Sequence, residues 1–197
     1  ERSRDATEAA VGVEERRPGV ETDPHRFHDA TAAVRWSVVI PTRAGWENLS
    51  STLPGLLAAL GVDDEVVVVA DGCDMSLPGV RDPRCRVAVH VGAAGFAPAC
   101  NIGAREAGGA LLLFLNDDVE VVSPDWLEAL VEHAQRAEVG AVGAKLLYPD
   151  GSIQHAGIVL GVGGTANHAF RGQPGDSPGH RSLARCIRNC AAVTGAC

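Results

Sequence analysis

The sequence has few aromatic residues, an excess of acids over bases and no basic stripe. Aromatic side chains make up only 4% of its 197 residues, and 25 Asp and Glu residues against 17 Lys and Arg residues give a formal net charge of −8. Nucleic-acid-binding proteins use clustered positive charge to hold the phosphate backbone. We therefore expect partners other than nucleic acid.

Long apolar runs are also missing. The longest, residues 66–70 and 110–115, are strand-sized and far below the roughly 20 residues that a membrane-spanning helix needs. The first thirty residues are charged and lack the apolar segment of a signal peptide. We predict a cytoplasmic protein with no transmembrane segment in this chain, and peripheral association at the inner face of a membrane is the alternative.

The six cysteines include no Cys-x-x-Cys pair, which is the spacing typical of a zinc site. Cys186 and Cys190 lie four residues apart, and this spacing alone is a weak signal. We predict reduced thiols, as in most cytosolic proteins.

The composition changes at Trp36. Residues 1–35 are rich in Glu, Arg, Asp, Ala and Thr without apolar periodicity, which predicts a charged linker or peripheral segment. Residues 36–197 are predicted to form the folded domain. Because the chain opens on Glu1 and stops at the apolar run "AAVTGAC", we expect a fragment that is incomplete at its C-terminal end.

From Trp36 onward, strand patterns alternate with helix patterns. Short apolar runs predict four strands, "WSVVIPT" (36–42), "DEVVVVADG" (64–72), "CRVAVHV" (85–91) and "ALLLFL" (110–115), of which the first, second and fourth are expected to be buried. Helices are predicted over 47–60 and 95–109, and from Ser123 as N-cap with Pro124 as first helical residue. Two further strands are predicted on either side of the turn at 149–151. This order indicates an α/β three-layer sandwich with a mostly parallel, Rossmann-like sheet.

Polar residues follow three of these strands at the edge where open parallel sheets bind ligands. They are Pro41-Thr42-Arg43, Asp71-Gly72 and Asn116-Asp117-Asp118. The adjacent carboxylates of Asp117 and Asp118 repel each other unless a cation offsets them. Carboxylate and amide oxygens suit Mg²⁺ or Mn²⁺, and a cation shared with a diphosphate would also act as Lewis acid for the departing phosphate. The alternative is that the two acids begin a solvated turn.

On these motifs the sequence resembles the family 2 glycosyltransferases, inverting enzymes with the GT-A type nucleotide-diphospho-sugar transferase fold. The similarity is closest to the rhamnosyltransferase-like branch that acts on bacterial cell-surface polysaccharides. The matching segments are "SVVIPTRAGWENL", "EVVVVADGCD", "GFAPACNIGAREAGGALLLFLNDDVEVVSPDWLEALV" and "VGAVGAKLLYPDGSIQHAGIVLGVGG". They occur in the family's order, and the resemblance implies that residues 36–197 form a nucleotide-sugar-binding domain that is incomplete at the C-terminus.

The resemblance implies a role for each matching residue. It makes Asp118 the direct metal ligand, with Asp117 and Asn116 touching the metal, the ribose or the diphosphate. The other implied donor contacts are Pro41 and Thr42 in the base pocket, Asp71 on the base and Asn101 near the diphosphate, with a helix or turn cap as the alternative for Asn101.

The sequence departs from the family at several positions. Many relatives have two acids at the end of the second strand, whereas Ala70 precedes Asp71 here, so Asp74 is an alternative base contact. His155 in "IQHAG" matches the branch pattern, and a structural, hydrogen-bonded histidine is the other interpretation. The general base is expected in an acidic segment beyond Cys197.

The leading hypothesis is a metal-assisted, inverting, hexosyltransferase-type enzyme of cell-wall or polysaccharide biosynthesis. It would move a sugar from a nucleotide-diphospho-sugar to a hydroxyl of a polysaccharide or lipid-linked glycan. The alternative is a non-catalytic nucleotide-sugar-binding module, either a pseudoenzyme or a donor-binding fragment. A nucleotidyltransferase is disfavoured because "IPTRAGWENL" is not a Gly-rich, basic loop, and a Rossmann dehydrogenase is disfavoured because no Gly-x-Gly-x-x-Gly follows the first strand.

Overall fold

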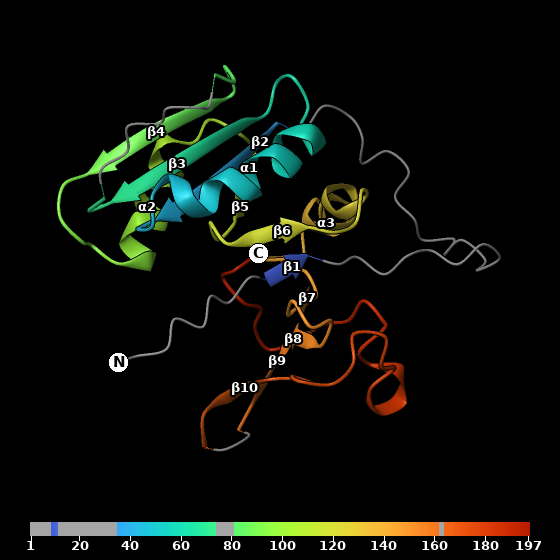
Figure 1. Cartoon of the computed structure of the whole chain (residues 1–197). Helices are drawn as coiled ribbons and strands as arrows, with labels where there is room; N and C mark the ends of the chain where they lie inside the picture. The colour runs from blue at the N-terminus through green and yellow to red at the C-terminus, as the bar shows by residue number, and fades with distance from the viewer. Residues whose placement is uncertain (1–8, 12–34, 74–80, 162–163) are drawn as a thin grey trace. The chain divides into compact units, whose positions relative to one another are not determined.

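The computed structural model describes residues 9–11, 35–73, 81–161 and 164–197, and the chain divides into two compact units (Figure 1). The sheet unit comprises Thr31–Val119 with Gly195–Cys197, and the hairpin unit comprises Glu1–Ala30 with Glu120–Thr194. Among the described residues, no helix is long and apolar enough to cross a membrane.

The sheet unit contains four parallel strands in the order β4-β3-β2-β5. Its central strand β3 is buried at every position, which explains its unbroken run of valines. The predicted parallel, Rossmann-like α/β sheet and its four strands are thus confirmed. Their bounds are β2 Trp36–Thr42, β3 Glu65–Asp71, β4 Cys85–His90 and β5 Leu111–Phe114.

Two helices connect these strands, α1 (Trp46–Ala59) from β2 to β3 and α2 (Phe96–Glu106) from β4 to β5. The first connection moves one way along the sheet and the second moves back, so right-handed crossovers place the helices on opposite faces. α2 lies on the face formed by Val39, Val67 and Val69, against which its Ala99 packs. Figure 1 shows α1 in front of the sheet.

Gly103 lets α2 approach the sheet closely. A Cβ at this position would lie 2.3 Å from Val39 Cγ1 and 3.0 Å from Val69 Cγ2. Helix propensity favours Ala over Gly by about 1 kcal/mol, whereas overpacking costs about 1–3 kcal/mol. A contact of 2.3 Å belongs to the upper part of that range, so the clash dominates.

We therefore expect Gly103→Ala to lower the free energy of unfolding by about 1–2 kcal/mol in urea denaturation. Gly140→Ala is the matched control, because a Cβ at the exposed Gly140 meets nothing within 4 Å. Equal stability of both variants and the wild type would contradict the tight packing of α2.

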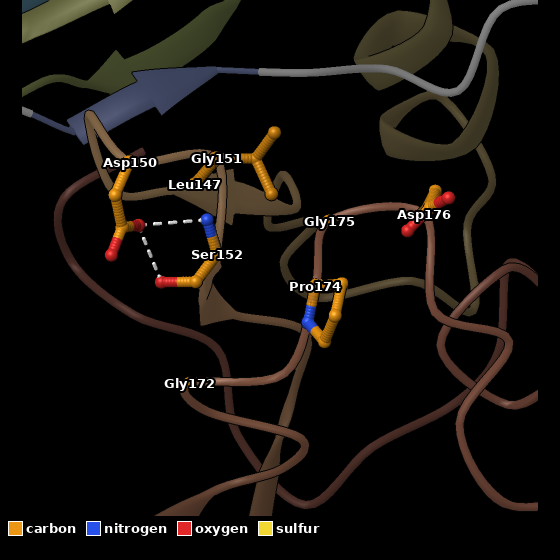
Figure 2. Close-up of a pocket in the computed structure, with 8 residues that line it drawn as sticks. All are labelled: Leu147, Asp150, Gly151, Ser152, Gly172, Pro174, Gly175 and Asp176. Carbon is orange, nitrogen blue, oxygen red and sulfur yellow. Dashed lines mark hydrogen bonds between the residues drawn. The ribbon is translucent and has the colours of Figure 1, made fainter.

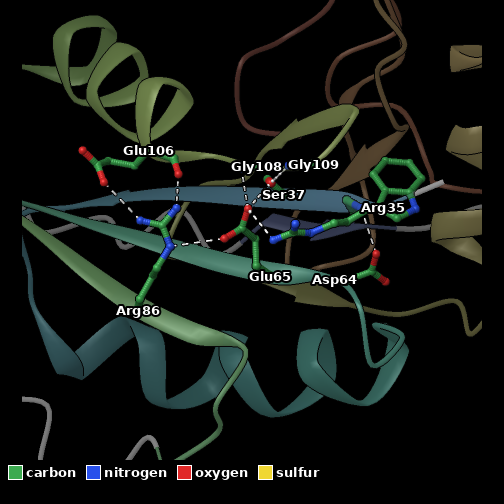
Figure 3. Close-up of polar contacts among 9 residues, drawn as sticks. Arg35, Ser37, Asp64, Glu65, Arg86, Glu106, Gly108 and Gly109 are labelled. Atoms are coloured by element: carbon green, nitrogen blue, oxygen red, sulfur yellow. Dashed lines mark hydrogen bonds and ion pairs between the residues drawn. The ribbon is translucent and has the colours of Figure 1, made fainter.

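Glu65, the first residue of β3, is the centre of a polar cluster (Figure 3). Its Oε1 accepts hydrogen bonds of 2.6 Å from Ser37 Oγ and of 2.6 Å from the Gly108 backbone N–H. Two arginines pair with the same carboxylate, Arg86 through Nε at 3.2 Å and Arg35 through Nη2 at 3.5 Å. Because Ser37 belongs to β2, Arg86 to β4 and Gly108 to the segment before β5, the carboxylate ties β3 to both neighbouring strands and to that segment.

The hairpin unit is built from short strands. A four-stranded sheet has the order β6-β1-β7-β8, and β9 pairs with β10 in a separate antiparallel hairpin. The sequence pattern indicated neither β1 nor β10. The bounds are β1 Ala9–Val11, β6 Val119–Val121, β7 Leu146–Leu147, β8 Ile153–His155, β9 Ile158–Leu160 and β10 Ala166–His168, with a 3₁₀ turn at His180–Ser182.

The predicted turn at residues 149–151 is confirmed. The Gly151 N–H donates to the Tyr148 carbonyl, and Gly151 has the positive φ of 79° that favours glycine. Asp150 Oδ1 accepts from both the backbone N–H and the hydroxyl of Ser152 (Figure 2). These bonds fix the hairpin between β7 and β8.

The predicted start of the third helix is wrong. α3 spans Trp126–Ala134 with Asp125 at the N-cap, so Ser123 is not the cap and Pro124 is not helical. Residues 124–125 form a turn instead. Proline suits the second position of a turn as well as the first position of a helix, since both need φ near −65°.

Candidate functional site

The carboxyl ends of β2, β3 and β5 meet at one edge of the sheet unit, as expected for parallel strands. Thr42 ends β2, Asp71 ends β3, and Asn116 lies just beyond β5. This edge therefore carries most of the predicted site residues.

Asp117 is held by three side chains. Its Oδ2 accepts a 2.5 Å hydrogen bond from Thr42 Oγ1, and its Oδ1 accepts a 3.3 Å bond from Asn48 Nδ2. Its backbone carbonyl accepts a 2.7 Å bond from Thr52 Oγ1. Asp117 is thus fixed in both side chain and backbone, by β2 on one side and α1 on the other.

Thr42 is buried, and its hydroxyl both donates and accepts a hydrogen bond. It donates to Asp117 and accepts a 3.1 Å hydrogen bond from the Gly45 backbone N–H. Because Gly45 is the N-cap residue of α1, this chain links the start of the helix to the carboxylate. The neighbouring Pro41 is half-buried in the same strand end.

Asn116, Asp117 and Asp118 are all half-buried, so the acidic loop is accessible at the sheet edge. The last residues of the chain also hold this loop, since the Asn116 N–H donates to the Ala196 carbonyl at 3.0 Å.

Asp71 is buried, and both of its oxygens accept backbone hydrogen bonds. The N–H groups of Ala94 and Gly95, at 2.7 and 2.9 Å, are the main reason that the pKa of Asp71 lies below its ordinary value. His90 Nδ1 lies 3.4 Å from Asp71 Oδ1 and lowers the pKa further. The carboxylate fixes the loop before α2, and its contact with a nucleotide base remains a prediction.

The remaining predicted residues lie elsewhere. Asn101 is exposed in the middle of α2, so the alternative that it caps a helix is wrong. Asp74 lies outside the described residues. His155 belongs to the hairpin unit, in β8.

His155 is buried and hydrogen-bonded. Its Nε2 accepts from the Gly157 N–H at 3.2 Å, so the neutral ring carries its proton on Nδ1, which faces His168 Nδ1 at 2.9 Å. Burial, followed by the charges of His168 and Arg188, lowers the pKa of His155 to about 4. These contacts are those of a structural histidine, the second interpretation of "IQHAG".

Stability should therefore fall in acid because His155 must be protonated. Its folded pKa is below the unfolded value of 6.5, so its contribution is complete above pH 6.5 and is lost as the pH falls toward 4. We expect urea denaturation to show a loss of about 2 kcal/mol between pH 7 and 4.5 that is largely absent in His155→Gln. His180→Gln, an exposed change in the same unit, is the control, and an equal pH slope in all three proteins would contradict this assignment.

The acidic loop offers a small oxygen donor set. Across the part of the chain that the structure describes, no three or more His, Cys, Asp or Glu side chains are grouped to hold a metal ion. Mg²⁺ and Mn²⁺ need fewer, since they bind through one or two carboxylates together with substrate phosphates and water. Asp117 and Asp118 fit that mode, with the phosphates supplying the other ligands.

A separate concavity of about 530 Å³ lies in the hairpin unit (Figure 2). Asp150 and Asp176 are the charged residues of its lining, which also includes Leu147, Gly151, Ser152, Gly172, Pro174 and Gly175. It contains none of the predicted site residues.

The sequence reasoning missed Asn48 and Thr52. Both contact Asp117 from α1. Their signal was present, because they are polar residues four apart, next to the buried stripe of Leu49, Leu53 and Leu56.

Comparison with known proteins agrees with this architecture. The sequence model of the family described as "Glycosyl transferase family 2" matches residues 37–158. The mannosyltransferase PcManGT from Pyrobaculum calidifontis, in complex with GDP-Man and Mn²⁺, aligns with a TM-score of 0.51 and 22% identity, over 58% of this chain and 36% of that chain. At that identity, the likeness shows the shared fold.

Two relatives are closer in sequence. "Uncharacterized protein y4gI" of Sinorhizobium fredii (strain NBRC 101917 / NGR234) is 36% identical over 169 residues, or 82% of this chain and 19% of that protein. "O-antigen biosynthesis protein RfbC" of Myxococcus xanthus is 52% identical over 102 residues, or 49% of this chain and 8% of that protein. The chain therefore spans less than a fifth of either relative's length.

Proposed function

Because this chain belongs to glycosyl transferase family 2, we propose that it is the donor-binding part of an inverting sugar transferase. It would bind a nucleotide-diphospho-sugar and direct the sugar to a hydroxyl of a glycan acceptor. The observation that carries this proposal is the acidic loop, in which Asp117 is fixed beside Asp118 at the ligand edge of the sheet.

In this proposal Asp118 and Asp117 hold a divalent cation, Mg²⁺ or Mn²⁺, together with the donor diphosphate. When bound, the cation would supply Lewis-acid stabilisation of the nucleoside diphosphate as it leaves. Asp117 keeps its orientation through Thr42 and Asn48, so the loop is arranged before the donor arrives. The proposal assigns none of the described residues as the general base that would take the proton of the acceptor hydroxyl.

The base end of the donor would lie along the neighbouring strand ends. Pro41 and Thr42 end β2, and Asp71 holds the loop that leads into α2. Asn101 is exposed on α2 and is proposed to contact the diphosphate side.

The names of related proteins suggest a substrate class. The structural neighbour is in complex with GDP-Man and Mn²⁺, and one relative is named for O-antigen biosynthesis. We propose a nucleoside-diphosphate hexose as donor and a bacterial surface polysaccharide or its lipid-linked precursor as acceptor.

A thermal-shift screen tests the proposal. Nucleoside-diphosphate sugars that differ in base and sugar are added with and without Mn²⁺, and the melting temperature is recorded. A ligand that binds only the folded state raises it, so we expect at least one donor to stabilise the protein in a Mn²⁺-dependent way. If no donor shifts the melting temperature and calorimetry detects no binding, the proposal is wrong.

A further inference from the structure

We propose that Asn48 and Thr52 of α1 are positioning residues that set the geometry of the Asp117–Asp118 loop and thereby its affinity for the metal–diphosphate unit of the donor. This inference rests on the proposed function, because it assigns new roles at the same site. Asn48 and Thr52 are four residues apart, so they lie on one face of the helix one turn apart. Both of them reach Asp117.

Thr52 acts on the backbone. Its hydroxyl donates to the Asp117 carbonyl at 2.7 Å, and that carbonyl belongs to the peptide bond between Asp117 and Asp118. Because a peptide unit is planar, holding its oxygen fixes the plane from which the Asp118 Cα departs. Thr52 therefore helps to set the orientation of Asp118 relative to Asp117.

The identity of residue 52 supports this role. Thr52 is 1% exposed, between the buried Leu49, Leu53 and Leu56 of the same helix. A buried hydroxyl is costly unless it is hydrogen-bonded, and an apolar residue here would bury more apolar surface. The bond to the acidic loop is the feature that an apolar residue at this position would lose.

Asn48 acts on the carboxylate. Its amide donates to Asp117 Oδ1 at 3.3 Å while Thr42 donates to Oδ2 at 2.5 Å, so one donor holds each oxygen. With both oxygens held, the carboxylate cannot rotate freely about its last torsion. The remaining lone pairs of Asp117 therefore keep a fixed direction.

The test compares nucleotide binding with and without metal in Thr52→Val, Thr52→Ser and Asn48→Ala. Calorimetry with GDP, UDP and dTDP, each with and without Mn²⁺, gives the factor by which Mn²⁺ increases affinity. We expect Thr52→Val to reduce that factor by about tenfold, the lower end of the range typical of groups that orient metal ligands. For Asn48→Ala we expect a smaller, severalfold reduction, because its bond of 3.3 Å is the longer one. Thr52→Ser keeps the hydroxyl and should stay close to the wild type.

Ser51→Ala is the matched control, because it removes an exposed hydroxyl of α1 that bonds only its own helix, at the Asn48 carbonyl. A merely structural role would lower affinity equally with and without Mn²⁺, so an unchanged Mn²⁺ factor in Asn48→Ala and Thr52→Val overturns the inference. Asn48 is half-buried, so Asn48→Ala decides the question even if Thr52→Val does not fold. A wild type that binds none of the three nucleotides would overturn the proposed function together with this inference.

Discussion

Replacing Asp118 with Ala is expected to weaken Mn²⁺-dependent binding of the donor by about 100-fold or more. Residues that only orient metal ligands typically contribute 10–100-fold, and a direct ligand should contribute at least as much. The loss should appear only in the presence of metal, because Asp118 is proposed to contact the donor through the cation. Calorimetric titration of the stabilising donor, with and without Mn²⁺, measures both affinities.

Asp117→Asn and Asp63→Ala complete the comparison. Asp117→Asn keeps the side-chain shape but removes one charge and disturbs the bonds to Thr42 and Asn48, so we expect an intermediate loss. Asp63 is an exposed acid of the same unit, and its removal controls for the change in net charge. Donor binding by Asp118→Ala at wild-type affinity in Mn²⁺ would exclude Asp118 as the metal ligand.

Replacing Glu65 with Ala is expected to lower the free energy of unfolding by about 3 kcal/mol at neutral pH, because it removes a buried carboxylate that is the shared acceptor of the buried Ser37 hydroxyl and a backbone N–H. The Ser37 hydroxyl and the Gly108 N–H would lose their acceptor, and Arg86 would lose its partner on β3 (Figure 3). Urea denaturation at pH 7 measures the loss. Glu47→Ala, at an exposed position in the first turn of α1, is the control.

The contribution of Glu65 should also depend on pH. Burial raises its pKa, but the bonds from Ser37, Gly108 and Arg86 outweigh burial, so the pKa lies below the ordinary value of 4.5. A lowered folded pKa means that this stability is complete above about pH 4.5 and is lost as the pH falls through the folded pKa. The stability difference between wild type and Glu65→Ala should narrow in acid, and a difference that widens below pH 4.5 would contradict the assignment.

Much of the fold could be predicted from local patterns. β2 and β3 are apolar and β-branched along their length because central strands of a parallel sheet are buried on both faces. The three-residue strands β1 and β10 are too short to carry such a pattern. β1 also depends on a pairing partner far away in the chain, β7, whereas β10 pairs with the neighbouring β9. The predicted start of α3 was wrong because the sequence Ser-Pro-Asp suits a turn as well as the first turn of a helix.

The candidate site was predicted in part. Thr42 ends β2 and Asp117 follows β5, and parallel strands of one sheet bring their carboxyl ends to the same edge, so the meeting of these two residues at one edge was predictable. The 2.5 Å hydrogen bond between them was not. The roles of Asn48 and Thr52 were missed. Their polar character beside an apolar helical stripe was visible in the sequence, but the loop that they contact is distant in the chain and is not specified by that local pattern. His155 looked like a site residue by its motif, and its surroundings are those of a buried structural pair.

The parallel sheet and the strand ends that carry Thr42, Asp71 and Asp117 could be predicted from the sequence, because hydrophobic periodicity and strand-end chemistry are local properties of the chain. The family was indicated by the resemblance of four segments. The bonding partners of the polar groups became known only from the three-dimensional fold. In the structure Asp71 accepts hydrogen bonds from the loop before α2, and Asp117 accepts hydrogen bonds from β2 and α1. The physical reason is that a hydrogen bond depends on distances and angles between residues up to 75 positions apart, which the order of residues does not fix.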